Sequence, residues 1–320
     1  MEKDTEKRTF GELLQLSMKS EDTEEWIDVY FTRPIGLVFA LFWNKLGVHP
    51  NAITILSIFL GVGAGVMFYH TDLVSNLWGV VLLMLANFCD STDGQMARIT
   101  GKKTRIGRML DGFAGDLWFF SIYAALCLRL MLQPIPFTDV AWGFWIWPVG
   151  FLAGIFCHSP QASLADYYRQ IHLLFLLGRE GSELDCYASQ HEIYESLPKK
   201  GAWLDRAFYY NYQNYCKSQE KRTPVFQAFY ARLKQVYGTI EQVPQELKDE
   251  FRAGSLPLMP ITNILSFNWR AISLYVFCLL NIPWAFFLMD LVVFNSLYHY
   301  MHGRHEALCG TLAEKWMKKE

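Results

Sequence analysis

The sequence lacks a strong charge imbalance and the motifs of common soluble enzymes. Its 29 basic and 31 acidic residues give a formal net charge of −2, which does not indicate a nucleic-acid partner. The seven cysteines are scattered and none forms a Cys-x2-Cys pair, so a zinc site is not indicated. The long polar stretch 164–260 contains neither a glycine-rich phosphate loop nor a nucleophile motif.

Charge is also missing from two long runs, residues 74–89 and 117–128. The first twenty residues are polar and of mixed charge without an apolar core, so we expect no cleavable signal peptide. Apolar segments long enough to cross a bilayer predict an all-α integral membrane protein. The six predicted transmembrane helices cover residues 51–70, 74–98, 106–132, 140–163, 261–281 and 283–302. The last two are separated near Asn281–Pro283, because a single helix there would be longer than a bilayer is thick.

Two other stretches are amphipathic or polar. Residues 24–46 mix tryptophan, tyrosine and phenylalanine with basic residues, which predicts an interfacial helix broken near Pro34–Gly36. Residues 164–260 are charged, rich in tyrosine and helical in pattern, which favours a small cytoplasmic cap over a separate catalytic domain. Turns are expected in that insert at Gly178–Gly181, Pro198–Gly201 and Pro244. The predicted parts are 1–46 (polar segment and interfacial helix), 47–163 (spans one to four), 164–260 (insert) and 261–320 (spans five and six with a cytoplasmic tail).

Three carboxylates interrupt this apolar sequence, Asp90 and Asp93 at the end of the second span and Asp111 in the third. An ionisable residue at membrane depth is costly and usually functional. Clustered acids repel one another unless a cation neutralises them, and carboxylates are hard oxygen ligands for Mg²⁺, Mn²⁺ or Ca²⁺. A basic loop between the two spans, with Lys102, Lys103, Arg105 and Arg108, adds positive charge. Metal ions with cations nearby suit the binding of a diphosphate.

The pattern Asp-x2-Asp-Gly-x2-Ala-Arg-x8-Gly-x3-Asp resembles the signature of the CDP-alcohol phosphotransferases. It runs through Asp90, Asp93, Gly94, Ala97, Arg98, Gly107 and Asp111. The segment Pro50-Asn51-Ala-Ile-Thr54 is similar to the Pro-Asn-x-x-Thr with which the family's first span begins. The resemblance covers about residues 25–130. It implies two Mg²⁺ or Mn²⁺ ions on the three aspartates, room for the nucleotide at Gly94 and Ala97, and charge from Arg98 on the diphosphate.

One position departs from the family pattern, which ends in Asp-x3-Asp with the last aspartate usually assigned as general base. Here that position is Gly115, and the aspartate follows as Asp116. On a regular helix Asp116 points about 140° away from Asp111, at roughly 100° per residue. We expect a one-residue π-bulge near Gly112–Gly115 to return Asp116 to the site as a catalytic carboxylate beside Asp111. The alternative is that Asp116 faces a neighbouring helix and another group is the base.

Further side chains are candidates for substrate binding. Gly107 belongs to the motif, and Arg105, Arg108 and Arg169 lie near span ends where they could hold an acceptor phosphate; ordinary anchoring at the cytoplasmic surface is the alternative. Asp166, Arg169 and His172 are spaced at i, i+3, i+6 and could meet the acceptor or form a solvated helix face. His299, His302 and His305 share that spacing, which favours a helix end at the membrane surface over a metal site.

The resemblance implies a transferase of phospholipid biosynthesis that moves a phosphatidyl group from CDP-diacylglycerol to a polar alcohol and releases CMP. Inositol phosphate or glycerol phosphate is the expected acceptor. The alternatives are an aminoalcohol phosphotransferase using CDP-choline or CDP-ethanolamine on diacylglycerol, a membrane prenyltransferase, and an ion-coupled transporter. The basic loop places the motif and both termini in the cytoplasm. The resemblance also implies a bacterial inner membrane protein, with a homodimer formed through the membrane helices.

Overall fold

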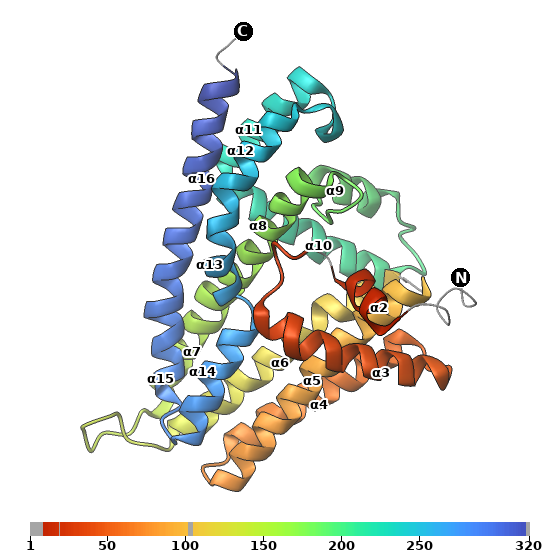
Figure 1. The fold of residues 1–320 in the computed structure, drawn as a ribbon. Helices are drawn as coiled ribbons and strands as arrows, with labels where there is room; N and C mark the ends of the chain where they lie inside the picture. The colour runs from red at the N-terminus through yellow and green to blue at the C-terminus, as the bar shows by residue number, and fades with distance from the viewer. Residues whose placement is uncertain (1–8, 19, 102–104, 318–320) are drawn as a thin grey trace. The chain divides into compact units, whose positions relative to one another are not determined.

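The computed structural model describes residues 9–18, 20–101 and 105–317. Those residues are helical without a β-strand, apart from one isolated bridge between Pro134 and Ala141, so the predicted all-α class is confirmed. The chain forms two compact units. Figure 1 labels most of their helices. The first unit comprises Met1–Ser159 and Phe267–Phe294, and the second comprises Pro160–Ser266 and Asn295–Glu320.

The helices of the first unit begin in the N-terminal segment and include π-helical and 3-10 turns, labelled η. They are α2 (Phe10–Ser17), η1 (Asp28–Thr32), α3 (Arg33–Lys45), α4 (Pro50–Tyr69), α5 (Leu73–Thr100), α6 (Arg105–Met131), η2 (Gly143–Trp145), α7 (Ile146–Phe151), η3 (Leu152–His158), α14 (Phe267–Leu279), α15 (Trp284–Leu288) and η6 (Met289–Phe294). Those of the second unit are α8 (Ser159–Leu177), α9 (Tyr187–Ser196), α10 (Trp203–Arg222), α11 (Pro224–Tyr237), η4 (Ile240–Gln242), α12 (Gln245–Ser255), η5 (Leu256–Leu258), α13 (Met259–Ile264) and α16 (Asn295–Met317).

Three helices of the first unit, α4, α5 and α6, are long and apolar enough to cross a membrane. They correspond to the first three predicted spans. Glycine lets α4 and α6 approach closely, because a Cβ added at Gly61 would lie 2.1 Å from Cδ1 of Trp118. One turn later, a Cβ at Gly65 would lie 2.2 Å from Oγ of Ser121. Small residues at such contacts are typical of helix packing in membranes.

The other three predicted spans are irregular. The segment 140–163 contains the 3-10 turn η2 and the π-helical turn η3, and 261–281 is divided between α13 and α14. The separation expected near Asn281–Pro283 is present, since α14 ends at Leu279 and α15 begins at Trp284. Within the described residues, only α4, α5 and α6 combine the length and apolarity of a membrane helix. Spans four to six therefore remain predictions.

A buried arginine joins the ends of several helices in the first unit. Arg129, near the end of α6, is 2% exposed. Its Nη1 donates to the carbonyl oxygen of Phe68 and to Oδ1 of Asn76, both at 2.9 Å. Its Nη2 donates to Oδ1 of Asn281 at 2.6 Å. The planar guanidinium group thereby fixes the ends of α4, α5 and α14 at the edge farthest from the motif.

The N-terminal segment corrects the prediction of a break at Pro34–Gly36, because α3 is continuous from Arg33 to Lys45. The irregularity lies earlier, in the π-helical turn η1, where the Arg33 N–H bonds to the carbonyl of Asp28. Pro34 then falls in the first turn of α3, where a missing N–H costs nothing. A helix is therefore present, with its irregular turn before Pro34 instead of at Pro34–Gly36, and its interfacial position stays a prediction.

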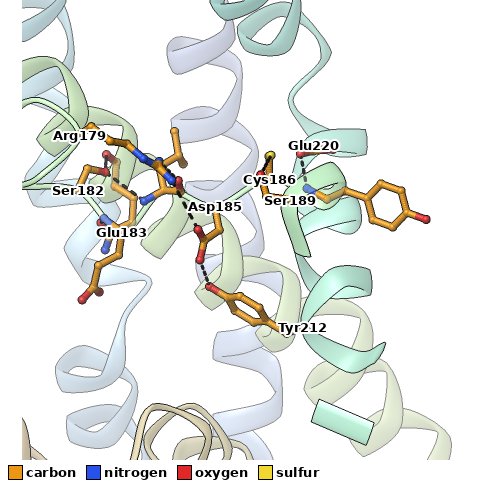
Figure 2. Close-up of polar contacts among 11 residues, drawn as sticks. Arg179, Ser182, Glu183, Asp185, Cys186, Ser189, Tyr212 and Glu220 are labelled. Carbon is orange, nitrogen blue, oxygen red and sulfur yellow. Dashed lines mark hydrogen bonds and ion pairs between the residues drawn. The ribbon is translucent and has the colours of Figure 1, made fainter. Parts of the chain in front are cut away.

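The insert packs around aromatic side chains within the second unit. Phe175 of α8 stacks on Phe251 of α12 with ring centroids 3.9 Å apart. The predicted turns are present, since α8 ends at Leu177, α10 begins after residue 202, and Pro244 precedes α12. Figure 2 shows how the loop after α8 is held, with Asp185 accepting a 2.7 Å hydrogen bond from the hydroxyl of Tyr212.

Candidate metal centre

The ends of α5 and α6 bring three aspartates together. One carboxylate oxygen from each of Asp90, Asp93 and Asp111 lies within 4.8 Å of the other two. Asp90 and Asp93 are one helical turn apart on α5, and Asp111 comes from the second turn of α6. Asp93 is buried, Asp90 is half-buried and Asp111 is exposed. Three carboxylates at this separation match the hard oxygen ligands that Mg²⁺ and Mn²⁺ prefer.

A side chain from α4 supports this cluster. The hydroxyl of Thr54 donates a hydrogen bond to Oδ2 of Asp93, and both residues are buried. Thr54 lies in the first turns of α4, which starts at Pro50. The contact joins residues 39 positions apart, and the acceptor of the threonine hydroxyl was not predicted from the sequence.

The remaining motif residues of α5 lie on the same side as the two aspartates. Gly94, Ala97 and Arg98 are half-buried, and the Arg98 guanidinium group folds over Gly94. A Cβ added at Gly94 would lie 3.5 Å from Nη2 of Arg98. Gly94 thus leaves space beside the carboxylates, and Arg98 brings positive charge to that space.

A second cation approaches from the N-terminal segment. The side-chain nitrogen of Gln95 donates to the carbonyl oxygen of Arg33 at 3.0 Å, which docks the start of α3 on the motif end of α5. The Arg33 side chain is paired with Glu24, with Nη2 3.0 Å from Oε1, and its charge interacts electrostatically with Asp90. Sequence reasoning placed Arg33 only in the interfacial helix. The sole indication was a basic residue shortly before the first span.

The expected π-bulge is absent. Helix α6 is α-helical throughout from Arg105 to Met131. A bulge sacrifices regular i→i−4 bonding, and nothing crowds the helix here, since a Cβ at Gly112 or Gly115 would meet open space. Asp116 therefore lies on the helix face that carries Phe119 and Tyr123, about 140° around the axis from Asp111.

That face of α6 turns toward other elements of the first unit. The ring of Phe119 lies 4.4 Å from the ring of His158 in η3, and the ring of Tyr123 lies 5.7 Å from it. Asp116 itself is exposed and is not among the three acids whose oxygens converge. The structure thus groups Asp111, and not Asp116, with the carboxylates of α5.

Comparison with known proteins agrees with this geometry. Residues 47–161 match the family model of the CDP-alcohol phosphatidyltransferases. The match covers little more than a third of the chain. The match contains α4, α5, α6 and all three clustered aspartates.

Two relatives with related names match part of this chain. A phosphatidylinositol phosphate synthase of Streptomyces avermitilis is 34% identical over 82 residues, which are 26% of this chain and 32% of that protein. An archaetidylinositol phosphate synthase of Pyrococcus horikoshii is 32% identical over 84 residues, which are 26% of this chain and 43% of that protein. The matches thus span less than half of either relative.

The other residues that the sequence predicted for substrate binding lie outside the aspartate cluster. Gly107 is half-buried in the first turn of α6. The backbones of Arg105 and Arg108 also belong to α6, but their side chains lie outside the described residues, as do Lys102 and Lys103.

The candidates on α8 belong to the second unit. Arg169 is half-buried, with Nη2 3.9 Å from Oδ1 of Asp166. His172 is buried, and its Nδ1 lies 2.7 Å from Oγ of Ser255 in α12. The three residues therefore do not form a common solvated face. His172 instead helps to hold α8 against α12.

The C-terminal histidines are used in packing. Nδ1 of His302 lies 2.7 Å from the hydroxyl of Tyr168, and the His305 ring stacks on the Tyr168 ring at 4.0 Å. Among the described residues, the group of acids and histidines placed to share a metal ion is the aspartate cluster of α5 and α6.

Proposed function

We propose that this chain is a membrane CDP-alcohol phosphatidyltransferase that transfers a phosphatidyl group from CDP-diacylglycerol to a polar alcohol and releases CMP. The observation that carries the proposal is the convergence of Asp90, Asp93 and Asp111 within 4.8 Å, at the end of apolar helices. Transferase chemistry is supported by the family match, and the names of both relatives favour inositol phosphate as acceptor. Glycerol phosphate is the second choice.

The three aspartates would hold divalent cations, which we propose to be two Mg²⁺ or Mn²⁺ ions. When bound, such ions polarise the phosphoryl group and stabilise the charge of the departing CMP. Gly94 and Ala97 leave room for the nucleotide, and Arg98 balances charge on the diphosphate. The hydroxyl oxygen of the acceptor forms a bond to the phosphatidyl phosphorus, the bond from that phosphorus to CMP breaks, and the hydroxyl proton passes to a base.

Two carboxylates of α6 were expected to act catalytically, Asp111 and Asp116. Asp111 is exposed and lies within the cluster, whereas Asp116 was expected to reach the site through a bulge that α6 does not contain. A general base must lie within hydrogen-bond reach of the proton that it removes, directly or through one water. We therefore favour a carboxylate of the cluster over Asp116 as the group that receives the proton.

Arg105, Arg108 and Arg169 are retained as proposed contacts for substrate phosphates, because positive charge near a diphosphate and a phosphorylated acceptor lowers their mutual repulsion. Gly107 is retained as a proposed substrate contact because it belongs to the motif. We propose that the motif faces the cytoplasm of a bacterial inner membrane, where the basic loop between α5 and α6 would lie. A homodimer through the membrane helices is part of the same proposal.

The rival enzyme classes are less well supported. A membrane prenyltransferase needs a second aspartate-rich motif in a later span, where Asp290 is the available acid. Asp290 is fully buried and accepts hydrogen bonds from Tyr123 and Arg270. The Asp290 carboxylate is therefore engaged in buried hydrogen bonds inside the first unit. An ion-coupled transporter would give no reason for the spacing of Gly94, Ala97 and Arg98.

The test supplies the full chain in lipid nanodiscs with Mg²⁺ or Mn²⁺ and measures CMP release and lipid product mass. CDP-diacylglycerol is offered with inositol phosphate, glycerol phosphate or serine, and CDP-choline and CDP-ethanolamine are offered with diacylglycerol. We expect a phosphatidyl product from the first set, lost in Asp93→Asn and kept in the control Asp139→Asn, which alters an exposed loop carboxylate. Product from the second set alone would assign the aminoalcohol class, and no CMP release with any pair would contradict the proposal.

A further inference from the structure

The side chain of Thr54 makes a contact that the motif pattern does not explain. Its hydroxyl has one proton and two acceptors within reach, Oδ2 of Asp93 and the carbonyl oxygen of Pro50 at 3.3 Å. The carboxylate oxygen is both nearer and charged, so it receives the proton. Thr54 is 2% exposed and Asp93 is 4% exposed, so water does not compete for this bond.

This bond restricts the Asp93 carboxylate. The terminal torsion of an aspartate is broad and roughly two-fold, so an unrestrained carboxylate samples several orientations. With Oδ2 engaged by Thr54, the Asp93 carboxylate samples fewer orientations, so less conformational freedom is lost when a cation binds. Groups that hold metal ligands in this way usually change metal affinity by 10–100-fold when removed.

The anchor of this contact is itself fixed. Thr54 stands on α4, which packs along α5 and, through the close approaches at Gly61 and Gly65, along α6. The carbonyl oxygen of Thr54 accepts a 2.7 Å hydrogen bond from the hydroxyl of Ser57, one turn further along the same helix. Helix α4 therefore supplies no carboxylate to the cluster, yet it determines how one of them is held.

We propose that Thr54 is a positioning residue of the aspartate cluster, whose hydroxyl orients Asp93 and raises the affinity of the cluster for a divalent cation. The inference rests on the proposed function only in assuming that the cluster binds metal. It concerns affinity for the cation itself, which can be measured without any lipid substrate.

The experiment titrates Mn²⁺ into the purified full chain in nanodiscs and follows free Mn²⁺ by electron paramagnetic resonance. Thr54→Val keeps the shape of the side chain and removes the hydroxyl, so we expect 10–100-fold weaker binding. Thr54→Ser restores the hydroxyl and should bind within about threefold of the wild type. Thr262→Val is the matched control, because it makes the same change at a buried threonine whose hydroxyl donates to the carbonyl oxygen of Leu258 in the second unit.

A second experiment measures the rate of CMP release as a function of Mn²⁺ concentration. Thr54→Val should need 10–100-fold more Mn²⁺ for half-maximal rate and recover most of its rate at saturation. A merely structural role would lower the rate and the melting temperature together, without that recovery. If Thr54→Val does not fold, Thr54→Ala is compared with Thr54→Ser, and misfolding of both Val and Ala variants would overturn the positioning role.

The outcomes separate the two proposals. Equal Mn²⁺ affinity in wild type and Thr54→Val overturns the role of Thr54, while Asp93-dependent Mn²⁺ binding and CMP release leave the proposed function intact. Failure of the wild type to bind Mn²⁺ more tightly than Asp93→Asn removes the metal centre and the role of Thr54 together.

Discussion

Replacing Asp116 by asparagine tests the consequence of a regular α6 for catalysis. Asp116 lies five positions after Asp111, which places their Cα atoms about 7.5 Å apart along the axis at 1.5 Å per residue. The two side chains also diverge by about 140°. A base acts within about 2.6–3.2 Å of its proton, or through one water, so a carboxylate displaced this far should contribute little. We expect Asp116→Asn to lower CMP release less than tenfold, whereas Asp111→Asn should abolish it.

The assay measures the initial rate of CMP release at saturating CDP-diacylglycerol and Mg²⁺, together with the melting temperature of each variant. Gly115→Ala is a useful companion, because it adds a methyl group where the structure has open space and should leave the fold unchanged. A fall of about 10²–10⁴ for Asp116→Asn at unchanged melting temperature would refute the reasoning, since that is the loss expected for a general base. It would mean that α6 rearranges when substrate binds.

Other features give independent predictions. Gly61→Ala should destabilise the first unit by about 1–3 kcal/mol through overpacking, measured as a lower melting temperature. Gly63→Ala is the control, because its Cβ would lie 3.6 Å from its nearest neighbour. Equal melting temperatures of the two variants would contradict the close contact at Gly61. Burial, reinforced by neighbouring histidines, lowers the pKa of His305 to about 3. The neutral form of His305 is therefore favoured in the folded chain, so its contribution to the free energy of unfolding is fully present above about pH 6.5. About 2 kcal/mol of that free energy is lost as pH falls from 7 to 5, because the unfolded chain takes up the proton. Denaturant titrations should show this loss in wild type and not in His305→Phe. A cysteine at Lys199 should react with an impermeant maleimide only from the cytoplasm, and one at Gln133 only from outside, in a chain whose own cysteines are replaced; the reverse pattern would invert the proposed orientation.

Several features of this protein follow from the sequence alone because they depend on local spacing. The uncharged runs flanking the motif correspond to the long apolar helices α5 and α6. The spacing of Asp90 and Asp93 puts both on one helix face whatever surrounds them. Proline and glycine end helices by their own backbone chemistry, and the turn after Leu177 and the start of α12 after Pro244 lie where these residues predicted them.

Other features depended on contacts between distant segments. The hydroxyl of Thr54 could have bonded to its own helix, and only the packing of α4 on α5 turned it toward Asp93. Arg33 reaches the neighbourhood of Asp90 because α3 docks on α5 through Gln95. Residue types at these positions are compatible with several partners, so the sequence leaves the partner open.

Asp116 is a further case in which the sequence left the local structure open. From the sequence, a bulge and a regular helix were both open at Gly112–Gly115, because glycine tolerates either backbone and a bulge costs only local bonding. The tertiary structure decided for the regular helix, since open space at both glycines leaves no crowding for a bulge to relieve. Local spacing thus determined that Asp90 and Asp93 share one helix face. Long-range packing decided that Asp111 of α6 joins them, how Asp93 is held, and that the cluster excludes Asp116.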